Sequence, residues 1–377
     1  MDSISDFLHR TMLIERLAGV SLYLFVVFLG YYLIKYAKNH RNLRIKLIFI
    51  LAILSLMSFF FVPDESKDLF RLWEIAQTYA TKDFITFFNV NVLKSREPLN
   101  LLFLYLGGKI GIRGVLPLVS SIIFYGCLFR VLYLLYKKNN VGGLNLADTY
   151  LLIMCAGAFL EVISDLRSFV AICLVFYAFT CEIVFKKSFL SNVIIYILAS
   201  LFHSTAIPLF VLRLLFVIFE KKSTKNKFLS LLLNLFVVFF IYLFGSSYVL
   251  GAIEKGITYF NNDIYSYFWE YLIGIAQLLL IIFYLLKTKK NADNSRTNVR
   301  HLLTIFSILL CVLVIEYNMF HRYILFAQNI FAVYYALTIS DNKGRVNSSY
   351  IRLYCILILA IAVTRGNLCG YKFFLLG

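Results

Sequence analysis

Apolar stretches long enough to form membrane-spanning helices recur along almost the whole chain, with short polar connections between them. A helix needs roughly 20 mostly apolar residues to cross a bilayer, and shorter helices are tolerated inside a packed bundle. The pattern predicts about twelve transmembrane helices, at residues 17–35, 46–62, 115–136, 146–163, 167–185, 188–203, 205–219, 228–245, 268–287, 301–316, 322–340 and 350–364. We therefore expect an all-α, polytopic membrane protein in which residues 1–377 form a single helical domain.

The connections between these stretches alternate in charge. One set is dominated by Lys and Arg, at residues 35–46, 137–138, 186–187, 220–227, 287–300 and 341–345. Because cytoplasmic connections carry an excess of Lys and Arg, we place this set in the cytoplasm. The other set mixes acids with Arg and His, at residues 63–97, 161–167, around 203, 245–267 and 316–322. It then lies outside the cell, together with both chain termini.

Two segments of the outer side need separate treatment. Residues 99–113 are apolar but contain three glycines, Lys109 and Arg113. If this segment crossed the membrane, the later basic connections would face outward, so we expect a short re-entrant or interfacial helix. The preceding outer loop, residues 63–97, has apolar residues at helical spacing from 69 to 79. We expect an amphipathic helix there, lying at the outer membrane surface.

Composition excludes several classes of protein. Hydrophobic residues make up 61% of the chain and charged residues 15%, which argues against a soluble domain. The formal net charge of +17 sits in the cytoplasmic connections, so we expect no nucleic-acid partner. The seven cysteines form no CxxC motif, and HExxH, P-loop, GxSxG and DxD motifs are absent. Metalloprotease, ATPase and serine-hydrolase functions therefore have no support, and we expect neither a metal nor a cofactor.

Candidate chemistry gathers in the outer connections. Asp68 and Arg71 lie in the first outer loop, and Glu97 ends it. Asp165 lies just before a predicted helix, where an acid can cap exposed N–H groups, and Arg167 opens that helix. An arginine at this end opposes the helix dipole, so an anion should compensate it. That anion is either an internal carboxylate, from Asp165 or Glu161, or an anionic substrate.

Two further polar positions lie at the ends of predicted spans. His203 is either an interfacial histidine that the backbone satisfies or a general base. His321 and Arg322 lie in a polar corner before another span.

Two charged positions lie deeper in predicted spans. Arg213 is expected only to snorkel toward the interface. Glu182 and Lys186 have the spacing of an ordinary i,i+4 pair.

Four short motifs occur in the order seen in EpsG-type, Wzy-like polysaccharide polymerases, and on them the chain resembles that family. They are DLFR at 68–71, REP at 96–98, LRSFVA at 166–171 and LFHSTAIP at 201–208. The resemblance covers roughly residues 63 to 208, followed only by the hydropathy profile and Arg322. The chain departs from the family in lacking a Gly-x-Asp pattern before Asp68, and in having Ser168 where a polar amide is common.

The resemblance implies a membrane glycosyltransferase of GT-C-like architecture in the bacterial cytoplasmic membrane. Such an enzyme transfers the growing chain from undecaprenyl pyrophosphate to an acceptor hydroxyl of an incoming lipid-linked repeat unit, at the outer face. The implied partners are the lipid-linked oligosaccharide and membrane lipid, with a flippase and a chain-length regulator as protein partners. No metal is required, because the leaving group is a stabilised anion that arginine forks can bind.

The implied roles are hypotheses at this point. Arg167 and Arg322 are expected to bind the pyrophosphate, and His203 or Asp68 to act as the acceptor base. The remaining substrate-binding candidates are Arg71, Glu97, Asp165 and His321.

Three other functions stay open. A membrane O-acyltransferase would need a histidine that an acyl donor reaches from the cytoplasmic side, where the connections contain little but lysine and arginine. A flippase or secondary transporter predicts repeat symmetry between the halves of the chain, which the sequence lacks. An O-antigen-type ligase differs only in its acceptor.

Overall fold

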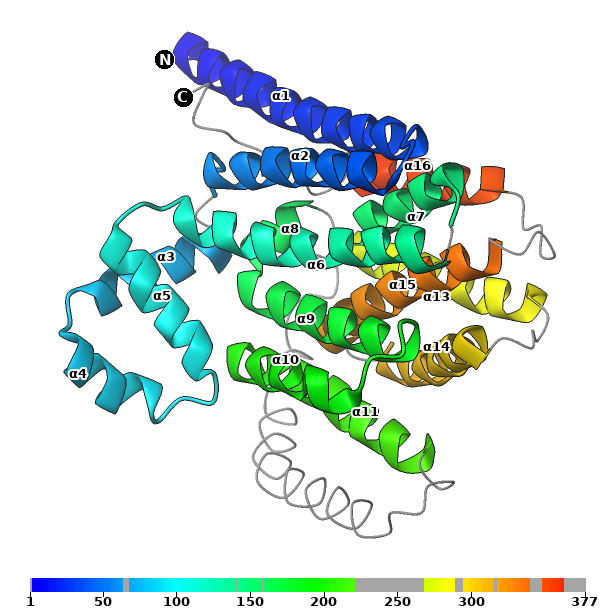
Figure 1. Ribbon diagram of the computed structural model, residues 1–377. Helices are drawn as coiled ribbons and strands as arrows, with labels where there is room; N and C mark the ends of the chain where they lie inside the picture. Colours follow the sequence, from blue (N-terminus) through cyan, green and yellow to red (C-terminus); the bar gives the residue numbers. More distant parts are fainter. Residues whose placement is uncertain are drawn as a thin grey trace.

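The chain is helical throughout the part that the computed structural model describes, which comprises residues 2–63, 68–139, 141–156, 159–220, 268–288, 294–314, 317–339 and 348–362 (Figure 1). These residues form fifteen α-helices and one short π-helix, η1. The helices are α1 (Asp2–Lys35), α2 (His40–Phe59), α3 (Asp68–Ala80), α4 (Phe84–Phe87), η1 (Phe88–Val92), α5 (Pro98–Ile110), α6 (Val115–Asn139), α7 (Gly143–Ala156), α8 (Phe159–Ser164), α9 (Leu166–Ile183), α10 (Phe189–Phe202), α11 (Ala206–Glu220), α13 (Phe268–Lys287), α14 (Asn294–Leu313), α15 (Tyr317–Ile339) and α16 (Ser348–Ala362).

Five of these helices are long and apolar enough to cross a membrane. Their candidate spans are Leu17–Lys35, His40–Phe59, Val115–Lys138, Leu166–Ile183 and Arg296–Leu313. Each predicted span overlaps a described helix except 228–245, which lies outside the described residues. The structure thus supports an all-α, polytopic membrane protein, while the number twelve stays a prediction.

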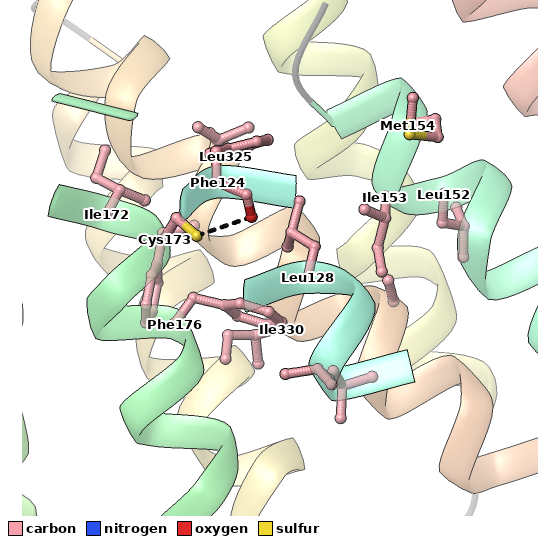
Figure 2. Packing of buried hydrophobic residues seen from close by; sticks show 14 of the residues in the cluster. Phe124, Leu128, Leu152, Ile153, Met154, Ile172, Cys173, Phe176, Leu325 and Ile330 are labelled. Carbon is pink, nitrogen blue, oxygen red and sulfur yellow. Dashed lines mark hydrogen bonds between the residues drawn. The ribbon is translucent and has the colours of Figure 1, made fainter. Parts of the chain in front are cut away.

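The core lies around α15, which packs against α7, α9, α13 and α14. Residues 323–338 of α15 are all buried, so this helix is surrounded by protein. Figure 2 shows apolar side chains of several helices meeting around Cys173 of α9. Its thiol donates to the carbonyl oxygen of Phe124 at 3.2 Å, so this cysteine behaves as a small core residue.

The helix ends that carry basic residues lie together at one end of the bundle. In Figure 1, α1, α6 and α9 end on the side away from the α3–α5 lobe, where α2 and α7 begin. The rings of His40 and Tyr136 lie 5.0 Å apart there, and the Lys138 ammonium lies over the ring of Phe185. For the connections that the structure describes, the alternation of charge along the sequence therefore corresponds to two ends of one bundle.

Residues 60–114 leave this bundle and return to the same end of it. A Cβ atom on Gly114 would lie 2.1 Å from the carbonyl oxygen of Phe59, so the chain comes back beside the point where α2 ends. This segment therefore starts and finishes at the same end of the bundle, and the re-entrant or interfacial placement of residues 99–113 stays a prediction.

The amphipathic helix expected between residues 69 and 79 is α3. On its apolar face Leu69, Leu72 and Ala76 are buried and α3 packs closely against α5, so this part of the face contacts protein. Gly108 permits that approach, since a Cβ there would lie 2.1 Å from the carbonyl oxygen of Ala76.

Two ion pairs lie inside the bundle, of which one contradicts an expectation and the other was not foreseen from the sequence. Arg213 does not snorkel and Glu182 does not pair with Lys186. Instead, Arg213 Nε donates to Glu182 Oε2 at 2.6 Å, with both side chains buried. Asp148 of α7, which is fully buried, accepts two bonds from Arg352 of α16 at 2.7 and 3.1 Å.

Candidate functional site

Most of the candidate side chains from the sequence meet at the end of the bundle opposite the basic connections. They come from the starts of α3, α9 and α15, from the residue before α5 and from the turn between α10 and α11. We call this set the charged cluster, and it comprises Asp68, Arg71, Glu97, Asp165, Arg167, His203 and Arg322.

Arg167 lies at the centre of the charged cluster. Its Nη2 lies 3.4 Å from Asp68 Oδ2, and its Nη1 lies 3.9 Å from Glu97 Oε2. Its Nε is buried and has no hydrogen-bond partner among the described residues. The anion expected beside this arginine was either an internal carboxylate, from Asp165 or Glu161, or an anionic substrate. The structure places Asp68 and Glu97 there instead, and the side chain of Glu161 lies outside the described part.

Asp165 joins α9 to α15. It precedes α9, but its carboxylate makes no capping bond to a backbone N–H, contrary to expectation. Instead, Ser168 Oγ donates to Asp165 Oδ1 at 3.0 Å, and Arg322 Nη2 lies 3.7 Å from Oδ2. The hydroxyl of Ser168 thus orients the carboxylate that faces Arg322.

Glu97 is positioned by the start of α5. Pro98 occupies the first turn of this helix, where its missing N–H costs nothing and its fixed φ favours helix initiation. The Glu97 side chain does not cap α5 but reaches the turn between α10 and α11. There Oε1 accepts bonds from the backbone N–H and the hydroxyl of Ser204, at 3.2 and 3.0 Å.

His203 is buried in that same turn, with 8% of its side chain exposed. Its Nδ1 accepts a bond from the backbone N–H of Thr205 at 3.1 Å, and its Nε2 lies 3.6 Å from Glu97 Oε1. Burial lowers the pKa of His203 to about 4; Glu97 opposes this shift and Arg322 adds to it. The imidazole is therefore neutral near pH 7.

The remaining candidates lie at the rim. Arg71 pairs with Asp68 one helical turn away, and 64% of its side chain is exposed. His321 directly precedes Arg322 on α15 and is partly buried. Sequence reasoning missed Ser204 and Thr205, although both follow His203 within the motif at 201–208.

The charged cluster is suited to holding an anion. Three arginines balance three carboxylates, and His203 is neutral. The contacts of Arg167 and Arg322 with carboxylates span 3.4–3.9 Å, whereas strong charge-assisted bonds are about 2.7–2.9 Å long. An incoming anion can therefore compete for both guanidinium groups. Within the described residues, no group of three or more His, Cys, Asp or Glu side chains is arranged to hold a metal ion.

One of the comparisons with known proteins gave a match. A family model described as the EpsG family matches residues 78–375, which is more than half of the chain. The matched range includes every member of the charged cluster except Asp68 and Arg71. No curated protein and no solved structure matches the chain.

Proposed function

Because the chain belongs to the EpsG family, we propose that it is a polymerase that joins lipid-linked oligosaccharide repeat units at the outer face of the bacterial cytoplasmic membrane. Membership by itself suggests a membrane protein of polysaccharide biosynthesis. The reaction moves the growing chain from polyprenyl pyrophosphate to a hydroxyl of an incoming unit. Polyprenyl pyrophosphate is released.

The convergence of Arg167 and Arg322 from two different helices carries this proposal. An arginine guanidinium binds phosphate oxygens as a planar fork. Two such groups can neutralise the charge that develops on the bridging oxygen as the glycosidic bond to pyrophosphate breaks. Removing one preorganised donor to such an oxyanion typically lowers the rate about 10²–10³-fold. Arg71, exposed at the rim, is then placed for contacts with sugar.

The acceptor hydroxyl needs a base. The charged cluster holds three candidates, which are His203, Asp68 and Glu97. Asp68 and Glu97 each lie beside Arg167, and His203 lies beside Glu97. A base and an anion-binding group therefore occur in the same site.

The side of the membrane follows from charge. The basic helix ends belong in the cytoplasm by the positive-inside rule. The charged cluster, at the opposite end, then faces the outside, where flipped lipid-linked units arrive. A flippase and a chain-length regulator are the corresponding protein partners.

The test compares where lipid-linked repeat units accumulate when the protein fails. A deletion strain should contain no polymer and should accumulate single lipid-linked units on the outer leaflet. Units stranded on the inner leaflet would instead indicate a flippase. Outer-leaflet polymer that is made normally but not joined to its final acceptor would indicate a ligase.

Arg167→Lys tests the fork within the same strain. Lysine keeps the charge but not the planar pair of donors, so polymer should largely disappear while the protein level stays normal. Arg41→Lys is the matched control, because Arg41 is exposed near the start of α2, at the basic end of the bundle. If Arg167→Lys makes normal polymer, Arg167 contributes only a structural charge and does not bind pyrophosphate as a planar fork.

A further inference from the structure

The hydrogen bonds of His203 determine which of its nitrogens carries the proton. Nδ1 lies 3.1 Å from the backbone nitrogen of Thr205 and 2.9 Å from the Thr205 hydroxyl oxygen. The hydroxyl can donate or accept, but a backbone N–H can only donate, so the arrangement that satisfies both contacts leaves Nδ1 unprotonated. The proton of the neutral ring therefore sits on Nε2, which faces Glu97 Oε1 at 3.6 Å. In this tautomer the lone pair of His203 is already engaged, and its N–H points at a carboxylate. His203 is thus arranged to donate toward Glu97 rather than to accept a proton.

Asp68 is also poorly arranged to accept a proton. Its Oδ1 is hydrogen-bonded to Arg71, and its Oδ2 accepts from Arg167 Nη2 at 3.4 Å. Both carboxylate oxygens therefore face guanidinium groups.

The two oxygens of Glu97 differ. Oε1 is held by the backbone N–H and the hydroxyl of Ser204 and faces His203. Oε2 accepts no hydrogen bond from the described residues, and its nearest charged neighbour is Arg167 Nη1 at 3.9 Å. One oxygen thus fixes the carboxylate, while the other faces the arginine expected to bind the donor.

We propose that Glu97 is the general base for the acceptor hydroxyl, and that His203 and Ser204 are positioning residues that hold its Oε1. This assignment rests on the polymerase function proposed above. In the step, the acceptor O–H gives its proton to Glu97 Oε2, and the acceptor oxygen bonds to the anomeric carbon of the growing chain. The bond from that carbon to the pyrophosphate oxygen breaks, and the electron pair leaves with polyprenyl pyrophosphate. Glu97 then returns the proton to solvent.

In this arrangement, binding of the pyrophosphate-linked donor also changes the charges around the base, Glu97. Arg167 Nη1 faces Glu97 Oε2 at 3.9 Å. A pyrophosphate that takes Arg167 removes that competing cation from the carboxylate. Glu97 then becomes a better proton acceptor only when the donor is bound.

The experiment uses the purified, full-length protein in proteoliposomes with lipid-linked repeat units, and measures both polymer length and released polyprenyl pyrophosphate. Glu97→Gln keeps an acceptor for Ser204 but cannot take a proton, so kcat should fall about 10²–10⁴-fold with KM nearly unchanged. His203→Gln supplies an N–H toward Glu97 and should lose less than about tenfold, whereas His203→Ala should lose more than His203→Gln. Glu74→Gln is the matched control, because Glu74 is exposed on α3 outside the charged cluster.

Two results would overturn the assignment. One is a Glu97→Gln protein within about tenfold of wild type, and the other is a His203→Gln protein as impaired as Glu97→Gln. If Glu97→Gln does not fold, Glu97→Ala, which likewise cannot take a proton, is judged by the same comparison. Failure of the polymerase function itself looks different, since the wild-type protein would then release no polyprenyl pyrophosphate.

Discussion

Replacing Glu182 by Gln removes one charge from the buried ion pair between α9 and α11. Glu182 Oε2 lies 2.6 Å from Arg213 Nε, and the two side chains are 1% and 7% exposed. Solvent therefore screens the pair little. The change keeps the shape of the side chain but leaves the Arg213 guanidinium without its carboxylate.

Two independent scales set the size of the effect. Removing one partner of a buried ion pair costs about 3–5 kcal/mol in soluble proteins. A single cation in the middle of a transmembrane helix costs about 2.5–3.5 kcal/mol on insertion scales. The ranges overlap near about 3 kcal/mol, so we expect Glu182→Gln to lower the ratio of folded to unfolded protein roughly 150-fold.

The assay is unfolding in mixed micelles titrated with a denaturing detergent, followed by circular dichroism. Replacing both residues, Glu182→Leu with Arg213→Met, should restore stability to within about 1 kcal/mol, because an apolar pair can replace a buried ion pair without loss. Lys186→Gln is the control, since this exposed side chain takes no part in the buried pair. It should change stability by less than about 0.5 kcal/mol.

Two outcomes would refute this reasoning. A Glu182→Gln protein as stable as wild type would mean that the pair is not buried from solvent. A Lys186→Gln protein as unstable as Glu182→Gln would restore the i,i+4 pair that the sequence suggested.

Three further predictions test the rest of the structure. Gly108→Ala should destabilise the protein and lower polymer yield, because a Cβ there meets the backbone of α3. Gly126→Ala is the control, since a Cβ there meets no atom within 4 Å, and it should be neutral in the same unfolding and polymer assays. The free energy of unfolding should fall as the pH drops from about 6.5 toward about 4. In this window His203 of the unfolded chain binds a proton, whereas the folded residue, with its pKa lowered to about 4, does not. His203→Gln should flatten this part of a curve of stability against pH. The third prediction uses a variant without reactive native cysteines, into which single cysteines are introduced at the exposed positions Asn89 and Lys187. In intact cells an impermeant thiol reagent should label the cysteine at position 89 but not the one at position 187. The reverse result would place the charged cluster in the cytoplasm.

Local patterns in the sequence were enough for the helical class and for most helix positions. The amphipathic spacing from 69 to 79 predicted α3 to within one residue at each end. Apolar stretches and alternating charge also predicted a bundle with two chemically different ends, because each depends only on neighbouring residues. The same information grouped Asp68, Arg167 and His203 on one side.

The choice of partners within that group needed the tertiary structure. Arg167 meets Asp68 across 99 residues, and Ser204 meets Glu97 across 107. Sequence reasoning considered nearby carboxylates for Arg167, because spacing along a helix reveals only neighbours three or four residues away. The packing of α3 against α5 and of α9 beside them decided which carboxylates the arginine faces.

The sequence by itself thus determined which residues are charged and which segments are helical, and it predicted which connections share a side of the membrane, since these follow from local hydropathy and charge. Only the tertiary structure decided that Glu182 pairs with Arg213 and that Asp148 pairs with Arg352 across 204 residues. It also decided that one oxygen of Glu97 is held by hydrogen bonds while the other accepts none from the described residues. The physical reason is that buried charges must find partners in three dimensions, and helix packing brings together positions that no local pattern connects.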